Sequence, residues 1–380
     1  MRIMISCGEA SGDLYAGALA AELHARAPSV EIVGFGGQRL QAAGATLAGD
    51  FTGLTVTGLT EIVRVLPQSW RMYRRLVNDA RTRRPDVFVA IDFSGFNFHL
   101  IAALRRLGIA IVYYVSPQLW AWRPRRIETM KRFVDKVLVI FPFEAGVYER
   151  AGVPVQFVGH PLVDLARAVQ PRSAFLSDLG LRPDAPTVAL LPGSRPNELR
   201  RIAPDMAAAI PLIRARLPGV QFVVARAPNL GDELFSPFPS DVVVVDNRTD
   251  DVLAASDVVV TASGTATVQA ALHEKPMVVV YRLSPLTYRL GKPFVRVDMY
   301  AMVNLVAGRR VVPELIQTDF TPERVAQETI LLLTDTERHA RTRDALRAVC
   351  ERLGPPGASG RAADAILDVA RRAPRGVSSA

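Results

Sequence analysis

Cysteine is scarce in this chain. Only Cys7 and Cys350 occur among the 380 residues, and they lie near opposite ends with no spacing typical of metal ligands. A disulfide framework and a cysteine-based metal site are therefore excluded. The sequence predicts free thiols in a reducing compartment, and we assign neither thiol a chemical role.

Long apolar segments are also missing. No stretch reaches the roughly 18 uncharged apolar residues that a membrane-spanning helix needs. The apolar run at the N-terminus is only Ile3 to Ile5, and Glu9 and Asp13 follow closely. The sequence predicts neither a spanning helix nor a standard export signal.

Two phosphate-loop signatures are absent from the turn after this first apolar run. GEASGDLYAG, residues 8–17, occupies the place of a nucleotide-binding turn, but it matches neither G-x-G-x-x-G nor G-x-x-x-x-G-K-[ST]. A dinucleotide oxidoreductase would need the first of these signatures there. One interpretation of the turn is a helix cap made by Ser11 or Asp13, and the other is a ligand contact made by its two acids.

Basic residues outnumber acidic ones. Lys and Arg total 46 against 37 Asp and Glu, which gives a formal net charge of +9. This excess favours an anionic partner, which would be nucleic acid, phospholipid headgroups or a phosphorylated substrate. The excess is concentrated in the N-terminal half, where residues 64–84 hold seven arginines and a single acid, Asp79, and residues 123–136 form a second basic cluster.

Short runs rich in valine and isoleucine alternate with longer segments of helical period. This alternation is typical of βαβ units around a parallel sheet. The expected strands are residues 2–6, 31–34, 87–91, 109–115, 136–140 and 156–158, then 187–191, 221–225, 242–245, 258–261 and 276–281. Because 380 residues are too many for one ordinary core, we predict an α/β protein with two Rossmann-like domains in series.

The predicted N-terminal domain covers residues 1–165, and the predicted C-terminal domain covers residues 166–350. Residues 159–186, which include four prolines, are the expected hinge. Residues 351–380 are expected to form a helix that packs back on the N-terminal domain and then a flexible tail. Ligands gather at the carboxyl ends of parallel strands, so we expect the site in a deep cleft between the domains.

Four stretches directly follow predicted strands. GEASGD and AIDFSGFNF, residues 8–13 and 90–98, belong to the first half, and Asp92 ends its strand. LLPGSRPNE, residues 190–198, places Arg195 beside a helix start, and TASGTATVQAAL, residues 261–272, places small hydroxylated residues at another. A helix cap explains GEASGD, and a solvated loop explains LLPGSRPNE, about as well as ligand binding does. For Asp92, a cap or loop contact is the more common role, and catalysis is the minority interpretation from that stretch alone. The fourth favours an oxygen-rich ligand, because its backbone can be approached closely.

Taken together, these stretches resemble one family, the lipid-A-disaccharide synthases, which are glycosyltransferases of the GT-B type. The matching stretches lie between Gly8 and Gln317 and are GEASGD, VGFGG, GLTEIV, PDVFVAIDF, FNF, YYVSPQLWAWR, FPFE, FVGHPL, LLPGSR, ASGTAT, PMVVVYR, VNLVAG and VPELIQ. The chain departs from the family pattern at three places. Gly95 replaces a second acid, Gln269 replaces glutamate, and Met-Val precedes Asn304 in place of Leu-Pro.

The resemblance implies an inverting transfer of 2,3-diacylglucosamine from its UDP derivative to 2,3-diacylglucosamine 1-phosphate. The products would be the β-1′,6-linked lipid A disaccharide 1-phosphate and UDP. Such a displacement needs a base for the acceptor hydroxyl and cations or dipoles for the leaving diphosphate. Asp92 is the expected catalytic base. The sequence has no D-x-D triplet, and we expect neither a metal nor a cofactor.

The remaining candidate residues divide between the two substrates. The expected acceptor-binding residues are Glu9, Ser11 and Asp13. The expected donor-binding residues are Ser194, Arg195, Glu198, Ser263, Gly264, Thr265, Ala266, Thr267, Gln269 and Asn304.

The arginine-rich segment has the composition of an interfacial helix. Leu66, Trp70, Tyr73 and Val77 recur on one helical face beside arginines. The alternative is an ordinary amphipathic helix packed on its own sheet. Because the family's substrates are lipids, we expect a cytoplasmic protein docked peripherally on the anionic inner face of a Gram-negative inner membrane. The expected membrane contacts are Val63, Val65, Leu66, Trp70, Arg71, Arg74 and Arg75.

Other hypotheses stay open at this point. Another UDP-sugar transferase, or a UDP-sugar epimerase, would share the architecture but would not need the apolar basic segment. A nucleic-acid binder would explain the charge but leave the strand-end clusters unused, and we expect no nucleic-acid partner. The sequence leaves open the acyl-chain preference and the oligomeric state, including a homodimer.

Overall fold

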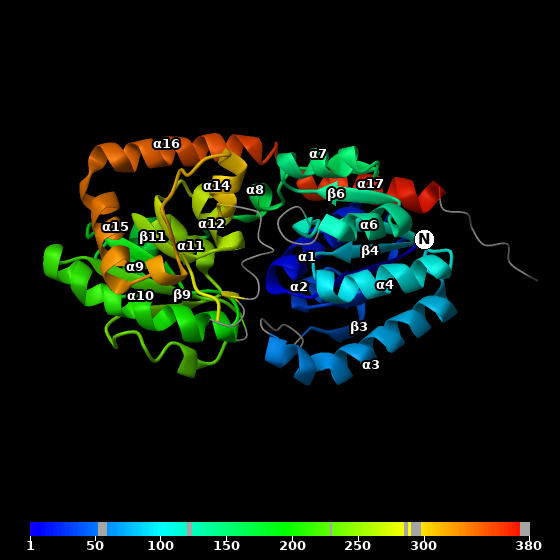
Figure 1. Ribbon diagram of the computed structural model, residues 1–380, viewed down its shortest axis with the longest axis horizontal. Helices are drawn as coiled ribbons and strands as arrows, with labels where there is room; N and C mark the ends of the chain where they lie inside the picture. The colour runs from blue at the N-terminus through cyan, green and yellow to red at the C-terminus, as the bar shows by residue number, and fades with distance from the viewer. Residues whose placement is uncertain (52–58, 120–123, 229, 285–287, 290–297, 373–380) are drawn as a thin grey trace, which may run out of the picture. The chain divides into compact units, whose positions relative to one another are not determined.

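The computed structural model divides the chain into two compact units. The first unit holds Met1–Pro161 and the chain from Leu353 on, and the second holds Leu162–Pro293 and Val297–Arg352. The structure describes residues 1–51, 59–119, 124–228, 230–284, 288–289 and 298–372, without the side chains of residues 59–65 and 124. Each unit is a parallel sheet with helices on both faces (Figure 1).

The first unit contains a seven-stranded sheet in the order β3-β2-β1-β4-β5-β6-β7. Its strands are β1 (Arg2–Cys7), β2 (Glu31–Gly36), β3 (Thr46–Asp50), β4 (Val87–Ile91), β5 (Ala110–Tyr114), β6 (Lys136–Val139) and β7 (Val155–Phe157). All neighbouring strands are parallel. The central strands β1 and β4 are covered on both faces and consist almost entirely of buried apolar residues, as parallel sheets require.

Helices connect these strands. They are α1 (Ala10–Arg26), α2 (Gln38–Ala42), α3 (Leu59–Arg83), α4 (Ser94–Arg106), α6 (Ile127–Phe133) and α7 (Pro142–Arg150). A short 3₁₀ turn, Pro124–Arg126, precedes α6. The last helix, α17 (Ala358–Arg372), packs on α1 and carries an ion pair between Arg26 Nε and Asp364 Oδ1 at 2.6 Å.

The second unit contains a six-stranded parallel sheet in the order β10-β9-β8-β11-β12-β13. Its strands are β8 (Thr187–Leu191), β9 (Gln221–Arg226), β10 (Val243–Asp246), β11 (Val258–Ala262), β12 (Met277–Tyr281) and β13 (Glu314–Ile316). Its helices are α8 (Leu162–Leu165), α9 (Arg172–Asp178), α10 (Pro196–Arg216), α11 (Thr249–Ala255), α12 (Thr265–Leu272), α14 (Met302–Ala307), α15 (Pro322–Thr334) and α16 (Thr336–Arg352).

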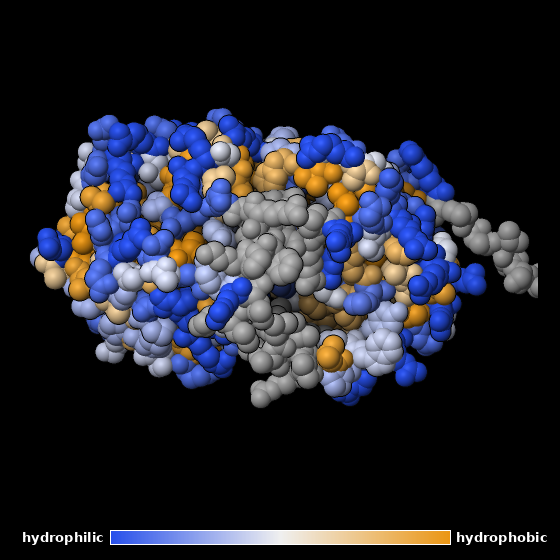
Figure 2. Space-filling model, in the orientation of Figure 1, coloured by the Kyte–Doolittle hydropathy of each residue, from blue (hydrophilic) through white to orange (hydrophobic). Residues whose placement is uncertain are grey.

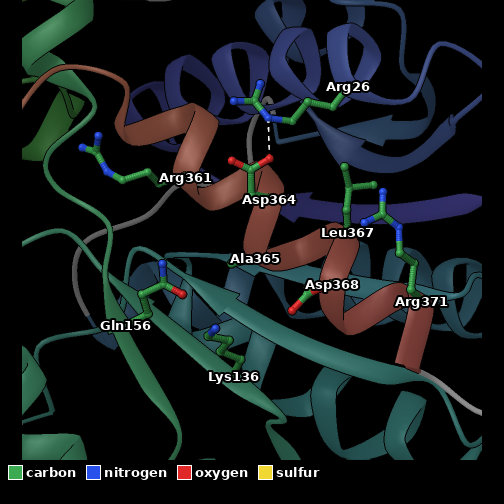
Figure 3. Close-up of a pocket in the computed structure, with 9 residues that line it drawn as sticks. All are labelled: Arg26, Lys136, Gln156, Arg361, Asp364, Ala365, Leu367, Asp368 and Arg371. Atoms are coloured by element: carbon green, nitrogen blue, oxygen red, sulfur yellow. Dashed lines mark hydrogen bonds and ion pairs between the residues drawn. The ribbon is translucent and has the colours of Figure 1, made fainter.

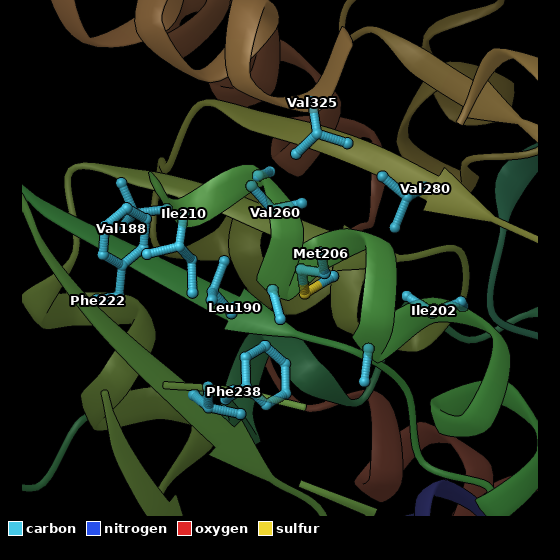
Figure 4. Packing of buried hydrophobic residues seen from close by; sticks show 14 of the residues in the cluster. Val188, Leu190, Ile202, Met206, Ile210, Phe222, Phe238, Val260, Val280 and Val325 are labelled. Atoms are coloured by element: carbon cyan, nitrogen blue, oxygen red, sulfur yellow. The ribbon is translucent and has the colours of Figure 1, made fainter. Parts of the chain in front are cut away.

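The core of the second unit shows how these elements are held together. Valines and leucines of β8, β11 and β12 face the apolar side of α10, where Met206 and Ile210 are buried, and Phe238 closes one side (Figure 4). The two prolines inside α10, Pro204 and Pro211, do not interrupt the helix. Close packing of this kind makes each side chain costly to shorten, at about 2–5 kcal/mol for a Leu, Ile or Met to Ala change.

The predicted fold class is confirmed, since both units are Rossmann-like α/β layers. The expected strands over residues 87–91 and 187–191 coincide with β4 and β8. Two strands were not predicted, β3 and β13. Both carry few buried residues and lie at the ends of their sheets, so neither shows the continuous apolar run that marks a central strand. The division between the units falls after Pro161.

Candidate active site

The loops after β1 and β4 emerge side by side at the carboxyl edge of the first sheet. Cys7 ends β1 opposite Ile91, the last residue of β4. The aromatic ring of Phe93 covers Gly8, where an added Cβ would lie 2.1 Å from the ring carbon Cγ. Gly8 is therefore required for this close approach, and it brings the GEASGD turn against the turn that carries Asp92.

Asp92 and Phe93 adopt a left-handed backbone conformation, which aspartate enters more readily than most residues but which is rare for phenylalanine. Their φ angles are +44° and +43°, in the left-handed region. A residue held there stores on the order of 1–3 kcal/mol, and such strain is concentrated at functional sites. Two side chains hold the turn through the Asp92 carbonyl oxygen, which accepts hydrogen bonds from Tyr113 Oη at 2.6 Å and from Asn97 Nδ2 at 3.0 Å. The half-buried Asp92 is thus fixed at a strand end.

The three expected acceptor contacts have different surroundings. Glu9 is the N-cap residue of α1 and makes no side-chain cap, and both Glu9 and Ser11 are half-buried. Asp13 is only 5 % exposed. Its carboxylate accepts N–H bonds from Gly37 at 2.8 Å, Arg39 at 2.9 Å and Leu40 at 3.1 Å.

Asp13 therefore requires a correction. Its carboxylate accepts from three backbone N–H groups at the start of α2, which favours a structural role over a contact with sugar hydroxyls. The alternative of a helix cap is the better description, except that Asp13 caps α2 and not its own helix. Of the GEASGD turn, Glu9 and Ser11 stay candidates for acceptor contacts.

His160, in the stretch FVGHPL, is buried inside the first unit. Its ring packs edge-on against Tyr15 with centroids 5.9 Å apart and lies 5.1 Å from the ring of Phe141. Burial lowers its pKa to about 3, so His160 is neutral at physiological pH. It packs as a core residue between Tyr15 and Phe141.

In the second unit, the loops after β8 and β11 are neighbours, since these strands pair directly. Arg195 is the N-cap residue of α10, and its Nη1 lies 2.9 Å from Glu198 Oε1. Glu198 is 7 % exposed, and its other oxygen accepts the N–H of Ser194 at 3.3 Å. These two bonds favour a role for Glu198 in positioning Ser194 and Arg195 over the direct donor contact expected from the sequence. Burial, followed by the charge of Glu198, raises the pKa of Tyr281 to about 12.

The start of α12 presents unused backbone donors. Among the described residues, the N–H groups of Gly264, Thr265 and Ala266 donate to no acceptor. A Cβ added to Gly264 would meet no described atom within 4 Å. Free N–H groups at an open helix N-terminus are suited to a phosphate, and Arg195 follows the neighbouring strand β8.

The other side chains near α12 are less available. Ser263 Oγ donates to the carbonyl of Tyr300 at 2.8 Å, and the buried Thr267 Oγ1 donates to the carbonyl of Gly264 at 2.8 Å. Both therefore shape the turn. Gln269 is half-buried, and its place one turn into α12 keeps it a candidate for a donor contact.

Asn304 requires a second correction. It is fully buried, and its amide nitrogen donates to Val312 O at 3.0 Å and Glu314 Oε1 at 2.8 Å. Its amide oxygen accepts from the N–H groups of Val311 and Val312 at 2.8 and 3.0 Å. All its bonding capacity is used to join α14 to β13, so it does not contact the donor directly. Glu314, which also accepts from the N–H groups of Tyr300 and Ala301, was missed by the sequence analysis.

The helix expected to contact the membrane is α3. The apolar residues predicted to share one of its faces fall into an exposed group and a buried group. Leu66 and Trp70 are 53 % and 60 % exposed, and Arg71, Arg74 and Arg75 are exposed beside them. Further along, Leu76 and Val77 are buried in the first unit's core, and Tyr73, half-buried, stacks on Trp70 with centroids 5.1 Å apart. The side chains of Val63 and Val65 lie outside the described residues.

A groove on the first unit lies away from these loops. It is lined by α17, by Arg26 of α1 and by Lys136 and Gln156 of the sheet (Figure 3). Arg26 is paired with Asp364, and Arg361 donates to backbone carbonyls at Val158, Pro355 and Pro356. Figure 3 shows the charged ends of Arg26 and Asp364 directed at each other, so this pair helps to hold α17 on α1.

The part of the chain that the structure describes contains no group of three or more His, Cys, Asp or Glu side chains arranged to hold a metal ion.

Comparison with a family model and comparison with single proteins point to the same family. The family model for lipid-A-disaccharide synthetase matches residues 3–365. A lipid-A-disaccharide synthase from Myxococcus xanthus (strain DK1622) is 42% identical over 372 residues, which cover 97% of each chain.

Solved structures show the same fold at low sequence identity. A UDP-GlcNAc 2-epimerase from Neisseria meningitidis bound to UDP-GlcNAc has a TM-score of 0.67 at 12% identity and covers 97% of this chain and 100% of its own. The calicheamicin glycosyltransferase has a TM-score of 0.59 at 17% identity and covers 98% of both chains. These likenesses establish the GT-B fold.

Proposed function

The chain belongs to the lipid-A-disaccharide synthase family, and we propose which of its residues carry out the family's transfer reaction. It is a glycosyltransferase whose substrates are UDP-2,3-diacylglucosamine and 2,3-diacylglucosamine 1-phosphate. Because an α-linked donor gives a β-linked product, the acceptor hydroxyl attacks directly from the side opposite UDP. That attack requires a base at the hydroxyl and stabilisation of charge at the departing diphosphate.

Asp92 is the proposed base. The observation that carries this assignment is its strained, doubly held turn at the carboxyl end of β4. Glu9 and Ser11, on the neighbouring loop after β1, are proposed to bind acceptor hydroxyls. The proton of the attacking hydroxyl passes to the Asp92 carboxylate while the bond between the sugar and UDP breaks.

The diphosphate is proposed to bind at the start of α12, with Arg195 as its cation. The N–H groups of Gly264, Thr265 and Ala266, which donate to no acceptor among the described residues, would supply dipoles for the diphosphate, and the helix N-terminus adds a partial positive charge. Glu198 holds Arg195 and Ser194 in place. Gln269 is proposed to contact the remainder of the donor.

A direct test separates a transferase from a UDP-sugar epimerase of the same fold. Purified protein incubated with UDP-2,3-diacylglucosamine in detergent is expected to release UDP at a rate at least tenfold higher when 2,3-diacylglucosamine 1-phosphate is present, because the acceptor is the nucleophile. Coupled detection of UDP measures both rates. A rate of UDP release that is the same with and without the acceptor would contradict a transferase. Conversion of the sugar of the UDP-sugar without release of UDP would contradict it as well.

We further propose that the N-terminal part of α3 docks on an anionic bilayer. No described helix has the length and apolar character needed to cross a membrane, while both substrates carry acyl chains. Leu66 and Trp70 are largely exposed on α3, and Figure 2 shows an isolated apolar group on the surface in the region of this helix. Nearby arginines contribute roughly 1 kcal/mol each at an anionic surface.

The double change Leu66→Ser, Trp70→Ser is expected to lower partitioning onto phosphatidylglycerol-containing vesicles by about tenfold or more. Burial of a large apolar side chain contributes about 1.5–3 kcal/mol, and exposed side chains can be replaced without loss of core packing. Turnover on detergent-dispersed substrate is expected to stay the same. Co-sedimentation with vesicles measures the partitioning, and high salt should weaken wild-type binding only in part.

The matched control replaces Val169 and Leu212, which are 83 % and 38 % exposed on the second unit, with serine. This control should sediment like wild type. Equal sedimentation of the α3 variant and wild type would show that the docking surface lies elsewhere.

A further inference from the structure

We propose that Tyr113 and Asn97 are positioning residues of the transfer reaction, which hold the Asp92 carboxylate in its reactive place through the Asp92 backbone carbonyl. This inference rests on the proposed role of Asp92. Neither residue touches the reacting atoms in this account; both act on the turn that carries the base.

The contacts around the turn tie three elements together. Asn97, on α4, is fully buried, and its Nδ2 donates to the carbonyls of Ser6 and Ile91, both at 3.3 Å, as well as to that of Asp92. Its Oδ1 accepts from Ser6 Oγ at 2.8 Å. Tyr113, on β5, adds the shortest bond to the Asp92 carbonyl at 2.6 Å. The ends of β1 and β4, the start of α4 and the strand β5 therefore all fix one peptide group.

The side chains around Phe93 complete the restraint. Its ring stacks with Phe35 at 6.3 Å and contacts Phe96 at 5.4 Å between centroids, and it lies directly over Gly8. The direction of the Asp92 side chain is therefore determined from both sides of the turn.

The residue types at positions 92 and 93 indicate that this turn has a functional role in addition to reversing the chain. A left-handed pair needed only for chain reversal would be expected to contain glycine, yet the two strained positions hold Asp92 and Phe93. The nearby glycine, Gly95, lies within α4, and an added Cβ there would meet no described atom within 4 Å. The left-handed conformation is thus placed on the residue proposed to do the chemistry and on the residue that follows it.

Tyr113 is suited to hold the carbonyl and not to act as a base itself. Burial, and then the negative charge of Asp92, raise its pKa well above the ordinary value. The phenol stays protonated and keeps its hydrogen bond over the working pH range. Loss of the hydroxyl would allow the turn to relax, and a displacement of about 1 Å at a reacting group can cost about 100-fold in rate.

Tyr113→Phe is the sharpest test, because it removes only the hydroxyl and keeps the buried ring. We expect kcat to fall by about 10- to 100-fold, with KM within about threefold of wild type and the thermal midpoint nearly unchanged. The matched control is Tyr148→Phe, since Tyr148 is also buried in the first unit and its hydroxyl is bonded to Ser116. This control should keep kcat within about twofold. If Tyr113→Phe lowered kcat no more than Tyr148→Phe does, the proposal would be overturned.

A double-mutant cycle distinguishes this inference from the assignment of Asp92. In an Asp92→Asn background, Tyr113→Phe should lower the residual turnover by less than about twofold, because the carboxylate to be positioned is gone. Equal losses in both backgrounds would show that Tyr113 acts independently and overturn the positioning role. If Asp92→Asn alone were nearly as active as wild type, the proposed base would be wrong, which is a separate outcome.

A second variant and a crystal structure address any effect on folding. Asn97→Asp keeps the shape but removes the donor to the Asp92 carbonyl, and it too should lower kcat more than it raises KM. A crystal structure of the Tyr113→Phe protein should show the Asp92 carboxylate displaced. An unmoved carboxylate together with a lowered kcat would contradict the mechanism.

Discussion

Replacing Asp92 with asparagine is expected to reduce turnover by about two to four orders of magnitude, the usual contribution of a general base. Asparagine has the same shape and tolerates a left-handed backbone, so the hydrogen bonds to the carbonyl of residue 92 should persist. The fold and UDP binding should therefore change little. Steady-state turnover at saturating substrates, with calorimetric UDP binding, measures both quantities.

Asp13→Asn is a useful companion to this variant. Asp13 is an acid of the adjoining loop, but its carboxylate bonds only to backbone N–H groups in the contacts described. Its replacement should reduce stability much more than kcat per folded molecule.

Turnover of Asp92→Asn above about a third of wild type would assign the base to another group.

Arg195→Ala is expected to lower kcat/KM for the UDP-sugar by about 100-fold or more. A charge-assisted contact at a departing diphosphate strengthens as negative charge develops, and loss of one such donor commonly costs about 10²- to 10³-fold in kcat. Arg195→Lys should recover part of the loss, because lysine keeps the charge but not the planar fork. Initial rates at varied donor concentration measure the effect.

Two controls accompany the Arg195 variants. Arg200→Ala removes an exposed arginine of the same helix that contacts only Asn197 in the described hydrogen bonds, and it should behave like wild type. Thermal unfolding must be compared, because Glu198 is buried and loses its partner. Wild-type kinetics of Arg195→Ala would contradict the proposed role of Arg195.

EDTA should have little effect on the wild-type rate if Arg195 and the α12 N-terminus stabilise the charge of the diphosphate. Strict dependence of the rate on added magnesium would contradict this assignment.

The strand ends could be predicted from sequence because buried parallel strands leave a clear apolar run. This was sufficient to place Asp92, Arg195 and the Gly264 turn at the carboxyl edges of the sheets. The direction of each polar side chain could not be predicted in the same way. Asp13 and Asn304 occupy suitable positions along the chain. Backbone donors of residues 37–40 engage Asp13, and backbone groups together with the Glu314 carboxylate, a few residues further along the chain, engage Asn304.

The positioning residues illustrate the opposite error. Tyr113 lies within an apolar strand and Asn97 within an amphipathic helix, so both would be assigned to the core by pattern alone. Only the three-dimensional structure shows that their polar atoms meet at the carbonyl of Asp92. The helix α3 gives a third case, since one periodic stripe contains both exposed residues, Leu66 and Trp70, and a buried one, Val77.

The central claim, an inverting glycosyl transfer, is tested most directly by the structure of the product. Wild-type protein with both diacylated substrates should give one disaccharide 1-phosphate for each UDP released, which mass spectrometry quantifies. Proton NMR of that disaccharide should show a β-configured 1′,6 linkage, as attack opposite an α-linked UDP requires. An α-linked disaccharide, or conversion of the UDP-sugar without any disaccharide, would contradict the account.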